Sequence, residues 1–276
     1  MLVGGSSARA FLNARLSAPS RVRARLADVP ARSDTLVFLP AWNEEENLPA
    51  VLDELARELP AIEVLVVDDG SRDRTAHLAR AHGAAVLSFE QNRGLRAAIA
   101  AGYASASEHG YAYCGRVDAD GQHPAAELRR LLDRVRSGAC DVAVGSRFVS
   151  GDGYEPYRYR PSAARAFVTG LLRRAIAVRL GRPFGAATSG MYAANARALP
   201  LLAEPYTSGA PEVESLIRLS QAGLTVDEVP VDMRERAGGE SKLRGKTAIK
   251  LVVTVVGTLL LYRRAREGRL WPRRPR

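Results

Sequence analysis

Three acidic clusters each follow a short apolar run of the sequence. They read PAWNEE at residues 40–45, DDGS at 68–71 and DADGQH at 118–123. Two carboxylates one residue apart at a strand end can turn toward one hard divalent cation, because Mg²⁺ and Mn²⁺ prefer oxygen ligands. Such an ion keeps coordination positions for phosphate, so the pattern indicates a site for a nucleotide diphosphate. Trp42 offers a flat apolar face for the base.

Each cluster also has an ordinary structural interpretation. Asn43 and the glutamates after it suit the start of a helix. Ser71 or Asp73 could cap the next helix, and the DADGQH aspartates could be solvated turn residues. Because adjacent carboxylates repel each other and acidic clusters follow three of the expected strands, we favour a ligand site.

The predicted elements would bring these clusters to one edge of a sheet. Strands are expected at 35–39, 62–67, 84–89, 112–117 and 141–145, and helices near 45–58, 73–82, 95–107 and 124–137. The alternation predicts an α/β fold with a mostly parallel central sheet flanked by helices. Beyond it we expect a helix at 163–180, a strand near 190–193, helices near 195–203 and 212–222, and a strand at 225–231.

The net charge of +10 lies at the two ends of the chain. Residues 1–34 hold six arginines against two aspartates, and residues 263–276 hold seven arginines against one glutamate. A nucleic-acid-binding face needs a basic patch on the fold itself, so nucleic acid is not an expected partner. Two cysteines are too few for a disulfide framework, and arginines interrupt the N-terminus where a signal peptide would be apolar. We therefore expect a cytoplasmic protein.

The most apolar stretch, residues 247–262, has an uninterrupted run of 12 residues from Leu251 to Tyr262. A helix of that length covers about 18 Å, whereas the hydrocarbon core of a bilayer is about 30 Å thick. Arginines follow it directly, so we expect a helix lying at an anionic membrane surface, at the inner face of the plasma membrane. A buried helix that closes the domain is the alternative.

Residues 35–147 resemble glycosyltransferase family 2 through PAWNEE, VVDDGSRDRT, NRGLRAAIAAGY, DADGQHP and VGSRF. The later segments TSGMYAANARAL, PEVESLIRLSQAGLTVDEVPV and RERAGGESKL resemble its polyprenyl-phosphate sugar synthases, of the dolichol-phosphate mannose synthase type. Composition sets apart a basic extension at 1–34 and an apolar helix with an Arg-rich tail at 246–276, which we expect at a membrane. Between them, the resemblance implies a GT-A-type domain at 35–245. It also implies inverting, metal-dependent transfer of a sugar, mannose first, from a nucleotide sugar such as GDP-mannose to polyprenyl phosphate.

The same resemblance assigns the site residues. The nucleoside would lie among Pro40, Trp42, Glu44, Val66 and Asp68, with Ala119 also at the donor. Asp118, Asp120 and Gln122 would hold Mg²⁺ or Mn²⁺ against the diphosphate, and Arg236 and Lys242 would reach the donor phosphates. Arg147 would lie near the acceptor phosphate, and Asp120 and Arg147 would be catalytic. The chain departs from the family pattern at Leu95, at 186–187 and at Trp42.

The acceptor decides whether a general base is needed. A lipid phosphate is already largely anionic at neutral pH, because its second pKa is about 6. A saccharide or natural-product hydroxyl, with a UDP-sugar as donor, would need a carboxylate such as Glu212 or Glu214, and Glu214→Gln would then abolish turnover. A nucleotidyltransferase would require a glycine-rich, basic loop where PAWNEE stands, and a non-catalytic scaffold would not need complete acidic clusters.

Overall fold

A computed structural model describes residues 33–149, 151, 153, 154, 177, 184, 185 and 189–234. The chain divides into two units, residues 1–32 and 33–276, and every described residue belongs to the second. The predicted apolar helix at 247–262 and the Arg-rich tail that completes 246–276 lie outside the described residues, as does nearly all of the helix predicted at 163–180.

Within the described residues, seven strands form one sheet in the order β3-β2-β1-β4-β6-β5-β7. Their bounds are β1 Thr35–Ala41, β2 Glu63–Asp68, β3 Ala85–Ser88, β4 Tyr113–Arg116, β5 Val142–Ser146, β6 Tyr192–Asn195 and β7 Val226–Pro230. All neighbours are parallel except β6, which runs antiparallel to both β4 and β5. The predicted mostly parallel sheet is confirmed, and the carboxyl ends of the six other strands share one edge.

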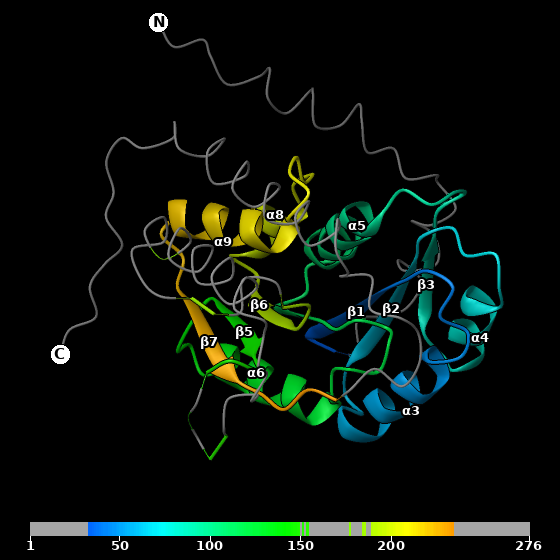
Figure 1. The fold of residues 1–276 in the computed structure, drawn as a ribbon, viewed down its shortest axis with the longest axis horizontal. Helices are drawn as coiled ribbons and strands as arrows, with labels where there is room; N and C mark the ends of the chain where they lie inside the picture. The colour runs from blue at the N-terminus through cyan, green and yellow to red at the C-terminus, as the bar shows by residue number, and fades with distance from the viewer. Residues whose placement is uncertain are drawn as a thin grey trace, which may run out of the picture. The chain divides into compact units, whose positions relative to one another are not determined.

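Helices cover both faces of the sheet (Figure 1). Helices α3, α4 and α6 pack on one face, and α5, α8 and α9 pack on the other. Their bounds are α3 Leu48–Glu58, α4 Thr75–Ala81, α5 Leu95–Glu108, α6 Ala125–Arg136, α8 Leu199–Ala203 and α9 Pro211–Gln221. Among these described helices none is long and apolar enough to cross a bilayer.

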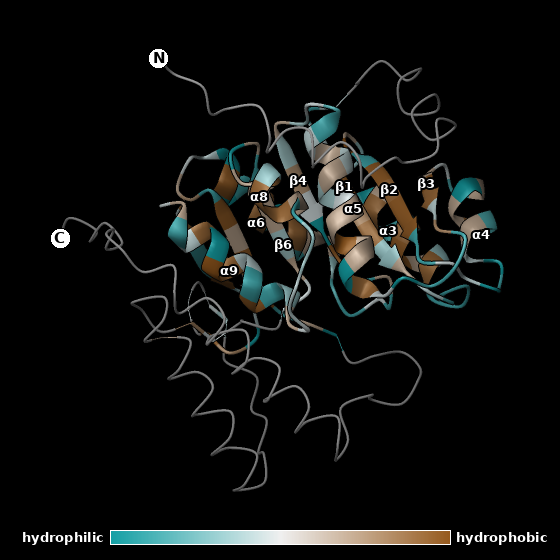
Figure 2. Cartoon of the chain, turned by 90° about the horizontal axis from the view of Figure 1, so that it is seen from above, coloured by the Kyte–Doolittle hydropathy of each residue, from teal (hydrophilic) through white to brown (hydrophobic). Residues whose placement is uncertain are grey.

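Successive strand residues serve two cores because side chains alternate between the faces. In β1, Leu36 and Phe38 are buried with the helices of the α5 face, whereas Val37 and Leu39 are buried with those of the α3 face. The strands accordingly carry apolar residues on both faces, and Figure 2 shows β2 and β3 largely in brown. The apolar stripe predicted for 124–137 is the buried face of α6.

Candidate functional site

The PAWNEE loop after β1 and the DDGSRDRT loop after β2 are joined by hydrogen bonds. The backbone N–H groups of Asn43 and Glu44 donate to Ser71 Oγ and Thr75 Oγ1, both at 2.9 Å. In return Asn43 Oδ1 accepts from the N–H of Arg72 at 2.9 Å. These bonds hold residues 43–45 out of a helix, so α3 begins at Leu48 and not near residue 45 as the sequence predicts.

The two aspartates of DDGS have different partners. Asp68 is 4% exposed, and its Oδ1 accepts the backbone N–H of Ser71 at 3.0 Å, so it shapes the turn. Asp69 accepts the N–H groups of Arg93 at 2.6 Å and Gly94 at 2.9 Å, which precede α5. The second aspartate therefore ties the end of β2 to the start of α5.

The DADGQH loop after β4 is organised by a buried histidine. The backbone N–H of Asp118 donates to His123 Nδ1 at 3.0 Å, and that of Gln122 donates to Asp120 Oδ1 at 3.1 Å. Burial, and to a smaller degree the nearby arginines, lowers the pKa of His123, although Asp118 and Asp120 oppose this shift. A neutral ring keeps Nδ1 as an acceptor, which holds the loop closed.

A cavity of about 390 Å³ opens where these loops meet. It has the size of a small-molecule pocket. Its walls come from the ends of β1 and β4, from the loop before α5 and from the first turns of α5; the lining residues are Pro40, Ala41, Trp42, Glu44, Asp69, Asn92, Gly94, Leu95, Ala98, Asp118, Ala119 and Asp120. Trp42 lines this cavity and is 46% exposed. Both aspartates of DADGQH share the pocket with that indole.

Gly190 is packed against the carboxylate of Asp118. A Cβ added at residue 190 would lie 2.2 Å from Asp118 Oδ2 and 2.7 Å from its Cγ. Gly190 precedes β6, the neighbour of β4 in the sheet. The glycine therefore leaves room for the Asp118 side chain in its present rotamer.

The donor set suits a hard divalent cation that is completed by other oxygens. The Asp118 side chain is 37% exposed, and Asp120 is almost buried beside it in the cavity wall. Among the described residues, no three or more His, Cys, Asp or Glu are grouped to hold a metal. Two carboxylates leave coordination positions for phosphate and water, which is how Mg²⁺ is commonly bound.

The structure brings five of the predicted donor residues to the cavity: Pro40, Trp42, Glu44, Asp118 and Ala119, together with the predicted catalytic Asp120. It does not bring Val66 or Asp68 there, because Val66 is fully buried in the core and Asp68 caps its own turn. Gln122 lies beside the cavity and does not line it.

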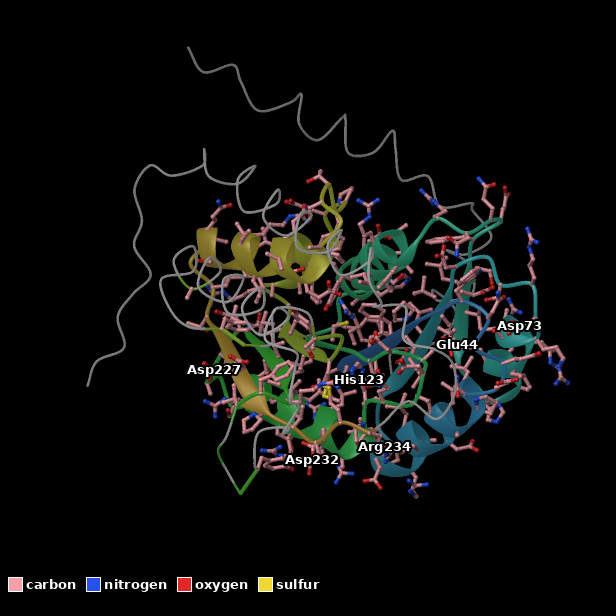
Figure 3. The ribbon with its side chains drawn as sticks, in the orientation of Figure 1. Glu44, Asp73, His123, Asp227, Asp232 and Arg234 are labelled. Carbon is pink, nitrogen blue, oxygen red and sulfur yellow. The ribbon has the colours of Figure 1, made fainter. Side chains whose placement is uncertain are left out.

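The predicted phosphate-binding arginine and lysine, Arg236 and Lys242, lie outside the described residues. The chain nevertheless passes the acidic loop just before them. The N–H of Arg234 donates to the Gln122 carbonyl at 3.0 Å, and its guanidinium binds both carboxylate oxygens of Glu54 on α3. Figure 3 shows Arg234 beside α3, below His123. Arg147 follows β5, and its charge is one of those that act on His123.

The interpretation of Glu214 as a general base needs correction. Glu214 is 0% exposed, and its carboxylate accepts hydrogen bonds from the backbone of Thr207 and Ser208 and from the guanidinium of Arg218. These contacts fix the loop before α9, so Glu214→Gln would disturb folding and would not test a base. Glu212 keeps some exposure, and it is paired with Arg116 at 2.9 Å.

Several residues at the cavity are not singled out by the sequence. The cavity is also lined by Asp69, Asn92, Gly94 and Leu95. The sequence marks the motifs that contain these residues, but it does not assign the individual residues to the site. The adjacent carboxylates are a signal for Asp69, but sequence alone does not say which of the two faces the ligand. Gly190 offers a weaker signal, since a glycine next to a short strand most often serves a turn.

The sequence that forms this site matches a known protein family. A model of glycosyl transferase family 2 matches residues 36–196, which contain all three acidic clusters. The chain belongs to glycosyltransferase family 2. The match confirms the resemblance that the motifs indicate, and it includes the acidic clusters around the cavity of this family 2 glycosyltransferase.

Two curated relatives of this family 2 glycosyltransferase have specific names. Polyprenol monophosphomannose synthase of Mycolicibacterium smegmatis is 34% identical over 231 residues, which cover 79% of this chain and 84% of the relative. Undecaprenyl-phosphate mannosyltransferase of Micrococcus luteus is 34% identical over 230 residues, covering 80% and 91%.

A solved structure shares the fold. Glucosyl-3-phosphoglycerate synthase of Mycobacterium tuberculosis, in complex with Mn²⁺, uridine-diphosphate-glucose and phosphoglyceric acid, superposes with a TM-score of 0.61 at 24% identity. The match covers 88% of this chain and 81% of that one. It supports the predicted GT-A-type architecture.

Proposed function

We propose that this glycosyltransferase moves a sugar, mannose first, from a nucleotide-sugar donor to polyprenyl phosphate, with inversion at the anomeric carbon. The observation that carries the proposal is that Trp42, Asp118 and Asp120 line the same cavity. The names of the two 34%-identical relatives, a polyprenol monophosphomannose synthase and an undecaprenyl-phosphate mannosyltransferase, support mannose and a lipid phosphate.

In this proposal the donor lies across the cavity from the PAWNEE loop to the DADGQH loop. Trp42 stacks on the base and Glu44 accepts hydrogen bonds from its polar edge. GDP-mannose is the first donor to test, and UDP-sugars come next. Asp118 and Asp120 hold Mg²⁺ or Mn²⁺; the fold neighbour from M. tuberculosis was crystallised with Mn²⁺. Gln122 is proposed as a further ligand, since its backbone already fixes Asp120.

In this proposal, side chains of the protein position the two substrates and stabilise the negative charge on their phosphates. When bound, the cation supplies positive charge to the leaving diphosphate. Arg236 and Lys242 are proposed to contact the same phosphates, which is supported by the anchoring of Arg234 to Gln122 and Glu54 immediately before them. Arg147 is proposed to bind the acceptor phosphate and orient it for in-line attack, which needs no general base.

The burial of Glu214 also favours a phosphate acceptor over a hydroxyl acceptor. A hydroxyl acceptor needs a carboxylate that can take its proton, and Glu214 is fully enclosed and hydrogen-bonded. Glu212 is held by Arg116. An acceptor that arrives as an anion avoids this requirement.

A lipid acceptor places the enzyme at a membrane. We propose that it is cytoplasmic and peripheral at the inner face of the plasma membrane, with the apolar stretch at 247–262 and the arginines after it in contact with anionic lipid. Vesicle sedimentation of the full chain with and without anionic lipid tests this part separately from catalysis.

The decisive experiment incubates the full chain with radiolabelled nucleotide sugars, polyprenyl phosphate and Mg²⁺ or Mn²⁺. We expect label from GDP-mannose to enter the organic phase, and this transfer to stop in EDTA. Asp120→Asn should abolish it without unfolding the protein, whereas Asp133→Asn, an exposed aspartate on α6, should not. Label that stays in a water-soluble product would contradict the lipid-phosphate proposal.

A further inference from the structure

A buried ion pair lies directly behind the acidic loop. Arg116 is the last residue of β4, two residues before Asp118, and its side chain is 3% exposed. Its Nη2 donates to Glu212 Oε1 at 2.9 Å, and Glu212 lies in the first turn of α9. The pair therefore connects the end of the central strand to the amino end of α9.

The surroundings of the pair are aromatic and incompletely hydrogen-bonded. The Arg116 guanidinium lies 5.3 Å from the ring centroid of Tyr192. In the part of the chain that the structure describes, the buried side-chain polar atoms without a hydrogen-bond partner are Tyr103 Oη, Tyr192 Oη and Arg116 Nε. Each such group costs about 1–3 kcal/mol, and a buried ion pair rarely stabilises a fold more than apolar residues would. Stability of the fold therefore does not explain why a charge lies here.

The charge of Arg116 acts on the acidic loop. The buried guanidinium lies at the end of β4, two residues before Asp118, and its ion pair with Glu212 holds it there. Arg116 is thus a permanent cation behind the cation-binding carboxylates. A positive charge at that position repels a divalent ion and attracts a diphosphate, and Glu212 offsets both effects.

We propose that the Arg116–Glu212 pair is a positioning element of the donor site that sets the balance between divalent-cation affinity and diphosphate affinity. This inference rests on the proposed function of the cavity. Arg116 and Glu212 touch neither ligand in this proposal. They act through Asp118 and through the potential at the end of β4.

Two substitutions of opposite charge test the pair. Glu212→Gln leaves Arg116 unbalanced, and Arg116→Met leaves Glu212 unbalanced. Mn²⁺ affinity is measured by the EPR signal of free Mn²⁺ at saturating GDP, and GDP affinity without metal is measured by calorimetry, with UDP in parallel. We expect Glu212→Gln to weaken Mn²⁺ binding about fivefold and to tighten metal-free GDP binding by a similar factor, from Coulomb energies at high effective dielectric.

Arg116→Met should shift both affinities in the opposite directions, and the double substitution should return them toward the wild-type values. Asp227→Asn is the matched control. Asp227 is also a buried carboxylate paired with an arginine, Arg134 at 2.6 Å, but it lies at the amino end of β7, at the opposite edge of the sheet. Figure 3 shows it well away from His123. Its loss should change neither affinity.

A purely structural role would weaken both ligands in both single variants, and that result would overturn the inference, as would unchanged affinities. If Arg116→Met does not fold, Glu212→Gln alone decides, because a structural defect cannot tighten GDP binding while it weakens Mn²⁺ binding. A wild-type protein that binds neither Mn²⁺ nor nucleotide would refute the proposed function and not the pair specifically.

Discussion

Replacing Gly190 with alanine perturbs the site at one defined group, the carboxylate of Asp118. The new Cβ would lie 2.2 Å from Asp118 Oδ2, whereas ordinary contact begins at 3.4 Å, so the carboxylate must move by about 1.2 Å, the difference of the two. The backbone of residue 190 does not have a positive φ, so alanine is acceptable there conformationally. The Asp118 side chain is 37% exposed and can move outward. We therefore expect the fold to survive and the carboxylate to leave its position.

The expected cost follows from the displacement. A misplacement of about 1 Å at a reacting centre can reduce the rate by about 100-fold, which is about 2.7 kcal/mol in transition-state free energy. The assay is the initial rate of mannose transfer from GDP-mannose to polyprenyl phosphate, with Mn²⁺ affinity measured separately. The melting temperature should fall by only a few degrees.

Gly185→Ala is a suitable control, because its Cβ would also approach a carboxylate, at 2.9 Å from Glu228 Oε1. Glu228 belongs to the edge strand β7 and does not line the cavity. Gly185→Ala should keep nearly full activity. Wild-type kcat/KM and Mn²⁺ affinity in Gly190→Ala would refute the assignment of Asp118 as a cation ligand held in place by this packing.

Three further substitutions have expected outcomes. Trp42→Ala should raise the donor KM about tenfold with kcat little changed, because stacking on a base contributes about 1–3 kcal/mol; an effect on kcat alone would contradict stacking. Asp69→Ala removes the acceptor of two backbone N–H groups and should destabilise the start of α5 by about 1.5–3 kcal/mol, which hydrogen exchange of that segment would report as lost protection. Burial works to raise the pKa of Asp141, but hydrogen bonds from Asn195 and Thr225 outweigh it and hold the pKa below the usual 3.8. Asp141 therefore stabilises the fold above about pH 4 and loses this contribution as the pH falls through its folded pKa; thermal denaturation from pH 7 to 3 should show a steeper loss for the wild type than for Asp141→Asn, and parallel curves would show that other groups dominate.

The sheet could be predicted because each strand is marked by the residues of its own short segment of the sequence. Each buried parallel strand is a short apolar run followed by a loop and an amphipathic helix, so β1, β2, β4 and β5 were found within a few residues of their ends. The antiparallel direction of β6 could not be predicted in this way. A run as short as YAAN carries no signal for orientation, which is decided by pairing with β4 and β5.

The same distinction between local and long-range information applies to the site. Residues that belong to a strand-end motif, such as Asp118 and Trp42, reach the cavity as predicted from the motif. Predictions failed where a side chain's direction mattered, as with the fully buried Glu214, whose partners lie in the loop before α9. The contacts of Gly190 with Asp118 and of Glu212 with Arg116 join residues far apart in the sequence, and the motifs that contain these residues do not predict them.

Those two long-range contacts both involve the end of β4 and the loop after it, and they have a common consequence. Gly190, next to β6, limits where the Asp118 carboxylate can go, and Glu212, on α9, balances the charge behind it. Both come from the part of the chain after residue 189, whereas the carboxylates themselves come from the parallel part of the sheet. The later part therefore does more than complete the fold, because it packs against the Asp118 carboxylate and pairs with the arginine that precedes the acidic loop. Variation there should change donor and metal affinity even where all three acidic clusters are intact.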